Sequence, residues 1–111
     1  MTVTLNSLDP VQLGITDAEL LASPANTKIK ITKCTACNDT TTIPTFSINK
    51  VPSGGSVGDD NLLINTKALG SRETYECPEV VGQILNASDA LYGIASVASQ
   101  ITLSISYISV V

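Results

Sequence analysis

The last part of the chain alternates bulky apolar and small hydroxyl side chains without a break. In residues 101–107 the bulky positions are Ile101, Leu103, Ile105 and Tyr107, with Thr or Ser between them. Because successive side chains of a strand point to opposite faces, this pattern predicts a strand with one buried and one polar face. A helix would distribute the same side chains around its whole circumference. The chain is therefore expected to build a sheet with an interior side.

Turn-forming residues divide the rest of the chain into short segments. They lie at 9–10, 23–24, 38–39, 52–56, 70–71, 78 and 88–89. The segments between them suit strands, which we expect near residues 2–6, 11–15, 18–22, 27–37, 43–51, 61–67, 72–77, 90–97 and 100–110. Residues 78–85 are the only segment in which we expect a helical turn, because proline fits the first position of a helix.

This pattern predicts an all-β protein. Short strands without a long helical segment favour an antiparallel β-sandwich of jelly-roll type, with eight or nine strands. A chain of 111 residues and 11.5 kDa suits one domain. We expect residues 20–111 to form that domain, and residues 1–19 to form either an arm that reaches a neighbour or edge strands.

Composition and charge restrict the class of partner. With 43% hydrophobic residues and a mean hydropathy of +0.27, the chain is apolar for its size. Other subunits are therefore expected to cover part of its surface. The net charge of −4 argues against a nucleic-acid partner. All six basic residues lie between 28 and 72, which we interpret as part of an ordinary solvated surface, with steering between oppositely charged regions of subunits as the alternative.

Neither a membrane partner nor secretion is expected. Residues 90–111 carry no charge, but Ser, Thr and Gln interrupt them too often for a membrane helix. Residues 1–5 have neither the basic nor the apolar region of a signal peptide. We therefore expect synthesis in a cytoplasm.

The chain lacks the side chains that most enzymes and metal sites use. It contains no histidine, so the usual general base and metal ligand is missing. We expect a protein that is not an enzyme and binds no cofactor. The aromatic residues are Phe46, Tyr75, Tyr92 and Tyr107. A carbohydrate platform would require Tyr75 and Tyr92 to share an exposed face.

Two short motifs have both a chemical and a structural interpretation. Cys34 and Cys37 have the spacing of zinc and redox motifs, but Cys77 is the only other thiol and zinc takes four ligands. We interpret the cysteines as small buried core residues, unpaired in a cytoplasmically made chain. Asp59 and Asp60 belong to no recognisable calcium loop, so we interpret them as turn residues.

One stretch resembles a known group of proteins. Residues 46–64 combine a strand, the sequence VPSGGS, the sequence GDDN and a second strand. Together with the segments 23–38, 72–76 and 85–96, this stretch resembles small phage and prophage virion proteins with a β-sandwich fold. The resemblance covers about residues 20–111. It departs from the usual pattern at Ser88, where those proteins have glycine before the aspartate, and this leaves the turn geometry open.

The resemblance implies a structural protein of a phage virion, made in the host cytoplasm. The function that it favours is capsid decoration or cementing, in which a homotrimer binds the outer face of the major capsid lattice. The alternatives are a tail, baseplate or fibre-attachment protein, bound to another virion protein, and a small glycan- or receptor-binding module. The loop of residues 52–60 should be exposed and mobile. Its candidate contact residues are Pro52, Ser53, Gly54, Gly55, Ser56, Asp59 and Asp60.

Overall fold

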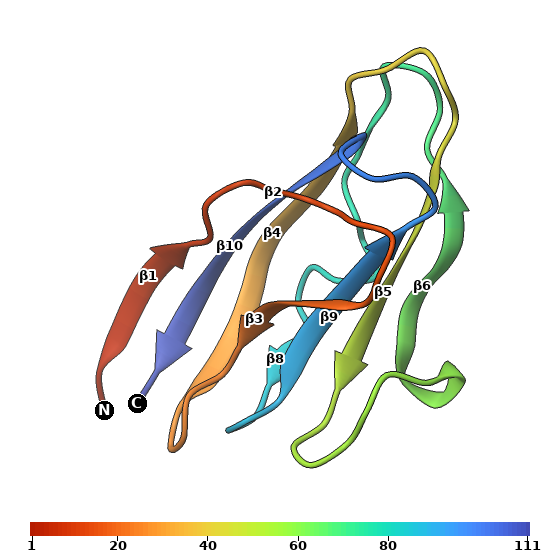
Figure 1. The fold of residues 1–111 in the computed structure, drawn as a ribbon. Helices are drawn as coiled ribbons and strands as arrows, with labels where there is room; N and C mark the ends of the chain where they lie inside the picture. The colour runs from red at the N-terminus through yellow and green to blue at the C-terminus, as the bar shows by residue number, and fades with distance from the viewer.

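The computed structural model describes all 111 residues as two antiparallel sheets packed face to face (Figure 1). Sheet A has the order β1 (Val3–Ser7), β10 (Ile101–Val110), β4 (Lys28–Asn38) and β7 (Thr74–Tyr75), with β2 (Val11–Gln12) also paired to β10 and β8 (Ile84–Leu85) to β4. Sheet B has the order β3 (Ala18–Ala22), β9 (Ala90–Ala95), β5 (Thr45–Val51) and β6 (Leu62–Ala68).

The strand order is that of a jelly roll. The chain crosses between the sheets repeatedly, with β1 and β2 in sheet A, β3 in B, β4 in A, β5 and β6 in B, β7 and β8 in A, β9 in B and β10 in A. The first and last strands lie side by side, as two wound Greek keys require. This confirms the predicted all-β sandwich. The structure has ten strands because β8 forms where no strand was expected, while the strands expected near 11–15 and 72–77 are the two-residue segments β2 and β7.

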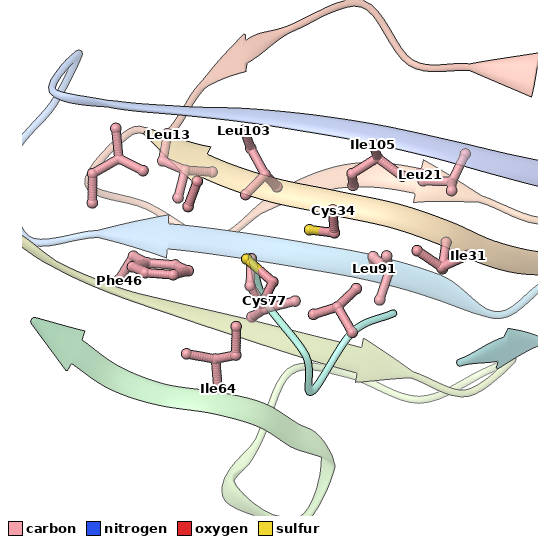
Figure 2. Close-up of a cluster of buried hydrophobic side chains, with 14 of the residues drawn as sticks. Leu13, Leu21, Ile31, Cys34, Phe46, Ile64, Cys77, Leu91, Leu103 and Ile105 are labelled. Carbon is pink, nitrogen blue, oxygen red and sulfur yellow. The ribbon is translucent and has the colours of Figure 1, made fainter. Parts of the chain in front are cut away.

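The core lies between the sheets and is built by alternate side chains of each strand. It is a cluster of 18 buried hydrophobic residues (Figure 2). Ile101, Leu103 and Ile105 of β10 are buried, so the predicted interior face of the terminal strand is confirmed. Phe46 and Ile48 of β5 face them from sheet B. Burying each large apolar side chain contributes about 1.5–3 kcal/mol to folding, and this set is the main source of stability.

A β-bulge sets the register of the central strands. Ser106 of β10 lies opposite Lys33 of β4, whereas Tyr107 lies opposite Ile31, so Thr32 is an additional residue in β4. The Thr32 hydroxyl donates a hydrogen bond to the Ser106 carbonyl oxygen (3.0 Å). The additional residue reverses the inward and outward positions of β4. The strand can therefore bury Ile31 before the bulge and Cys34 after it.

The helical turn expected at residues 78–85 is confirmed only in its first part, where Val81 N–H donates to the Cys77 carbonyl (3.2 Å), and is wrong from Ile84, where β8 begins. Hydrogen-bonded turns over residues 78–82 lead directly into β8. Gly82 N–H donates to the Ile31 carbonyl (2.8 Å), and Ile31 N–H donates to the Gln83 carbonyl (3.0 Å). This pairing with β4 overrides the local helical signal. The one helical element is a 3₁₀ turn over Asp59–Asn61, and no helix is long and apolar enough to cross a bilayer.

Residues 1–19 lie within the sandwich. β1 follows β10 in uninterrupted register from Val3, opposite Val110, to Ser7, opposite Ser106. Leu13 is 2% exposed and belongs to the core cluster. The two chain ends are adjacent (Figure 1). This N-terminal segment therefore contributes edge strands and core to the same sandwich.

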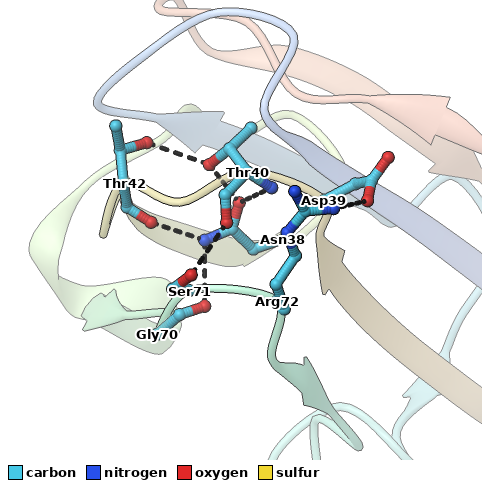
Figure 3. A network of polar contacts seen from close by, with 7 residues as sticks. All are labelled: Asn38, Asp39, Thr40, Thr42, Gly70, Ser71 and Arg72. Carbon is cyan, nitrogen blue, oxygen red and sulfur yellow. Dashed lines mark hydrogen bonds and ion pairs between the residues drawn. The ribbon is translucent and has the colours of Figure 1, made fainter.

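A buried asparagine holds one end of the sandwich together (Figure 3). Asn38, at the end of β4, is fully buried. Its Nδ2 donates to the carbonyls of Thr42 (2.8 Å), Leu69 (3.2 Å) and Gly70 (2.9 Å). Its Oδ1 accepts from the backbone N–H (3.0 Å) and hydroxyl (2.6 Å) of Thr40. One side chain therefore satisfies the backbone of two loops that are distant in sequence.

Replacing Asn38 with aspartate should lower the free energy of unfolding by about 3 kcal/mol, because a carboxylate oxygen would then face three carbonyl oxygens without a proton to donate. Urea unfolding at neutral pH measures this change. The matched control is Asn65→Asp, which makes the same chemical change on an exposed side chain of β6 and should cost less than about 0.5 kcal/mol. Equal losses in the two variants would contradict the role of Asn38.

Candidate interaction surface

The predicted contact loop is exposed and has an internal hydrogen-bond network. Residues 52–56, Asp59 and Asp60 are all exposed, as predicted. Asn61 Oδ1 accepts from Gly58 N–H (3.2 Å) and from Asn49 Nδ2 (2.7 Å), while Asn61 Nδ2 donates to the Ser56 carbonyl (2.9 Å). These bonds fix the second half of the loop against β5. The roles of the candidate contact residues Pro52, Ser53, Gly54, Gly55, Ser56, Asp59 and Asp60, and the mobility of the loop, stay predictions.

A second tether joins this loop to the turn before β9. Asp89 is 7% exposed. Its Oδ1 accepts from Ser53 N–H (3.0 Å), and its Oδ2 accepts from Asn86 N–H (3.0 Å). Ser88, which precedes it, has a φ of +67°, in the left-handed region that favours glycine. The turn therefore has the backbone conformation of a glycine although the chain has serine there.

Replacing Ser88 with glycine should raise the free energy of unfolding by about 0.5–1 kcal/mol, because glycine adopts this backbone conformation without steric cost. Urea unfolding provides the measurement. Ser56→Gly is the control, since Ser56 is exposed and outside the set of residues with positive φ. It should leave stability unchanged or slightly lower, because glycine gives the unfolded chain more freedom. A loss of stability in the Ser88 variant would refute the argument.

The largest departure from expectation lies on the outer side of sheet A, near the chain ends. Here apolar side chains from three strands line up across the sheet. Leu5 of β1 lies opposite Ile108 of β10, and Val3 lies opposite Val110. Ile84 of β8 continues the row of Leu5 and Ile108 across β4. We call these five residues the outer apolar patch. Val3, Leu5 and Ile84 are 55%, 81% and 48% exposed.

The polarity of the sheet is inverted in β1 and at the end of β10, where the inner side chains include Thr4, Asn6 and Ser109. The inner side chains of the neighbouring strands, Ile29 of β4 and Leu85 of β8, are apolar and buried. Asn6 Nδ2 donates a hydrogen bond to Ser109 Oγ (3.0 Å). A sheet of an isolated domain normally directs its apolar face to the core and its polar face to water. The inverted arrangement therefore leaves apolar side chains in water unless something covers them.

Two lysines lie within the outer apolar patch. Lys30 is placed between Ile108 and Ile84, and Lys28 lies opposite Val110. The ion pairs of the protein join Lys33 to Glu76 and Arg72 to Asp39, so they involve neither Lys28 nor Lys30. The two lysines, together with Ile84 and Val110 of the patch, line a hollow of about 260 Å³. The surface therefore combines apolar side chains with two unpaired positive charges.

The patch adjoins an unprotected strand edge. Of the other edges, β3 and β6 are each interrupted by a bulge and carry charged side chains, and β7 and β8 have two residues each. β1 has no bulge, proline or charge. Thr2 exchanges hydrogen bonds with Val111, and Leu8 N–H donates to Ile105. By alternation, the backbone groups of Val3, Leu5 and Ser7 point away from β10 and are open to a partner.

The sequence indicates that the apolar, uncharged terminal strand suits a subunit interface, but the contact residues predicted from it lie in the loop of residues 52–60 and not on this surface. In residues 101–107 the bulky residues occupy odd positions, and the pattern continues inward with Tyr107, which packs against the core. Ile108 and Val110 occupy even positions, so strict alternation directs them outward. The change of phase after Tyr107 predicts an apolar outer face. It does not predict that β1 and β8 extend the face.

The structure does not bring the tyrosines together. Tyr75, on β7, packs its ring edge against Phe46 at a centroid distance of 6.4 Å, and Lys67 Nζ lies 4.9 Å from its centroid. Tyr92 lies on β9 of the other sheet, where its hydroxyl donates to Glu19 (3.4 Å). The shared exposed face that a carbohydrate platform would require is not formed.

The Tyr75 hydroxyl is held by a carboxylate. It donates to Glu79, with its oxygen 2.7 Å from Oε2. This hydrogen bond, together with desolvation and the negative charge of Glu79, raises the pKa of Tyr75 to about 12. The neutral phenol is therefore favoured in the folded state relative to the unfolded state. The resulting stabilisation is present below pH 10 and is lost as the pH rises towards 12.

Ultraviolet titration of tyrosinate should therefore show an ionisation near pH 12 that disappears in Tyr75→Phe. Glu79→Gln should move this ionisation towards the ordinary pKa of tyrosine, because the carboxylate acceptor and its charge are removed. Glu76→Gln is the matched control, since Glu76 pairs with Lys33 instead. If the ionisation kept its position in Glu79→Gln, the assignment of its cause would be wrong.

The three cysteines occupy two environments. Cys34 and Cys77 are fully buried in the core, where their sulfurs lie near each other (Figure 2). A hydrogen bond with the Cys77 thiol and burial raise the pKa of Cys34. Cys37 is exposed, on the opposite face of β4 from Cys34. The prediction of buried thiols is therefore confirmed for Cys34 and Cys77 and wrong for Cys37, because residues three apart on a strand face opposite sides.

The remaining concavities are shallow. The largest, about 400 Å³, opens beside the predicted contact loop and is lined mainly by polar residues, among them Lys50, Asp60 and Asn61. Nowhere do three His, Cys, Asp or Glu side chains converge. The residue arrangement that stands out from an ordinary polar surface is therefore the outer apolar patch.

Comparison with known proteins finds similarity of fold. No protein-family model and no curated protein matches the sequence. Similar solved structures come from infectious bursal disease virus: the Gx strain (TM-score 0.49, 15% identity), the Gt strain (0.42, 11%) and the T13 viral particle (0.42, 10%). The similarity covers 97%, 96% and 96% of this chain but only 31%, 32% and 30% of those chains. Similarity at this level assigns neither a function nor a partner.

Proposed function

We propose that this chain is a structural protein of a phage virion and that it decorates or cements the capsid. The observation that carries the proposal is the outer apolar patch, because a surface with outward apolar side chains and inward polar ones suits a chain that works in an assembly. The resemblance of residues 46–64 to small phage virion proteins gives the class of assembly. The jelly roll is compatible with this role and, as a fold with many uses, does not specify it.

The mechanism is the addition of buried surface. A decoration protein that binds the outer face of the major capsid lattice and bridges its subunits makes opening of the shell more costly. A homotrimer would present three copies of one surface to the lattice, so each contact would raise the effective concentration of the next. The chain would be made in the host cytoplasm, would join the virion there and would catalyse no reaction.

A tail, baseplate or fibre-attachment role is the second candidate. The outer apolar patch would serve equally to bind another tail protein, so the two roles differ in copy number and partner. Glycan binding is not favoured by any observation, because Tyr75 and Tyr92 lie in different sheets.

Quantitative mass spectrometry of purified virions tests the proposal. The chain should be present at a copy number comparable with that of the major capsid protein, which is measured in the same digest as the reference. A decoration protein covers a lattice, so its abundance must follow the number of lattice sites. A small fixed number matching the tail proteins would support the tail role instead, and absence from the virion would refute both.

A further inference from the structure

We infer that the outer apolar patch, together with Lys28 and Lys30, is the surface with which this chain docks on its virion partner. The matching partner surface carries apolar side chains bordered by carboxylates. This inference rests on the proposed function and adds to it the binding residues and the chemistry of the partner.

The first argument is the continuity of the surface. Cross-strand neighbours in a sheet lie close enough for their side chains to touch. Leu5, Ile108, Lys30 and Ile84 are successive neighbours across four strands, and Val3, Val110 and Lys28 form the adjacent row. The hollow between Ile84 and Val110 gives a partner side chain a place to insert. The surface is therefore one continuous area that contains a hollow.

The second argument is the inversion of polarity. In β1 and at the end of β10, the inner side chains Thr4, Asn6 and Ser109 are polar, while the apolar side chains point outward. Exchanging the two faces would require only the opposite alternation in β1. The observed alternation places Val3 and Leu5 outward, at 55% and 81% exposure, and so favours a covered state over the free one.

The third argument is charge. A partner that covered the outer apolar patch would remove water from the ammonium groups of Lys28 and Lys30. Desolvating a charge without an opposite charge is costly. Neither lysine is in an ion pair within this protein, so the compensating carboxylates must come from the partner.

The charges also argue against a second copy as the occupant. A two-fold contact between two outer apolar patches would bring the lysines of both copies together, and like charges at an interface disfavour association. Pairing of two β1 edges would extend sheet A but leave its outer face exposed. A partner of different composition, with carboxylates around apolar side chains, satisfies both the apolar residues and the lysines.

The test uses virions that lack this protein, to which the purified chain is added back and its bound fraction measured against concentration. The double variant Lys28→Glu/Lys30→Glu should bind at least about tenfold more weakly, because repulsion replaces attraction. Leu5→Ser should also weaken binding, while its high exposure leaves stability little changed. Lys67→Glu/Arg72→Glu is the matched control, because it makes the same change of charge outside both the outer apolar patch and the predicted contact loop, and it should bind like the unmodified chain.

The outcomes separate the inference from the proposed function. If the unmodified chain does not bind these virions, the proposed function fails and the inference fails with it. If it binds and the double variant binds equally well, the function stands and the docking surface is wrong. Equal weakening by Lys67→Glu/Arg72→Glu would also overturn the inference, because it would show a general effect of charge. A change of oligomeric state in the double variant, measured by sedimentation, would overturn it in favour of a second copy.

Discussion

The pairing of β4 with β10 supports the rest of the structure. It extends from Lys28, opposite Val110, to Asn38, opposite Ile101, through the middle of sheet A. Every other strand of that sheet attaches to one of these two, with β1 and β2 on β10 and β7 and β8 on β4. Because β10 is the last strand, sheet A can be completed only when the C-terminal segment lies between β1 and β4. The fold therefore depends on long-range contacts, which form slowly relative to local ones.

The two halves of β10 direct their apolar side chains to opposite faces of sheet A. The first half of β10 places Ile101, Leu103 and Ile105 in the core. The second half extends beside β1, and there Ile108 and Val110 face outward. The bulge at Thr32 lets β4 follow this division, because it buries residues on both sides of the bulge while keeping Lys28 and Lys30 on the outside.

Local patterns in the sequence predict the sandwich. The features that they do not predict depend on pairing between segments that are distant in the sequence. Alternation and turn residues locate most strands because both signals act over a few residues. Three features involve distant segments and have no local signal in the sequence: the additional residue at Thr32, the pairing of Gly82 with Ile31, and the hydrogen bonds of Asn38 to Leu69 and Gly70. Composition alone marks the loop of residues 52–60 as a candidate contact site. The patch requires knowing which strands are neighbours, and only the phase of Ile108 and Val110 pointed to it.

The motif that carries the family resemblance and the surface that carries the docking inference have different physical roles. The motif contains polar side chains that form hydrogen bonds within the loop and to its neighbouring turn, namely those of Asn49, Asn61 and Asp89. These side chains therefore stabilise one loop conformation, and the motif is a feature of the fold. Val3 and Leu5 lie before residue 20, outside the resemblance, and face solvent. Substitutions at Val3 and Leu5 would therefore leave the loop motif intact, because those side chains contribute little to the core.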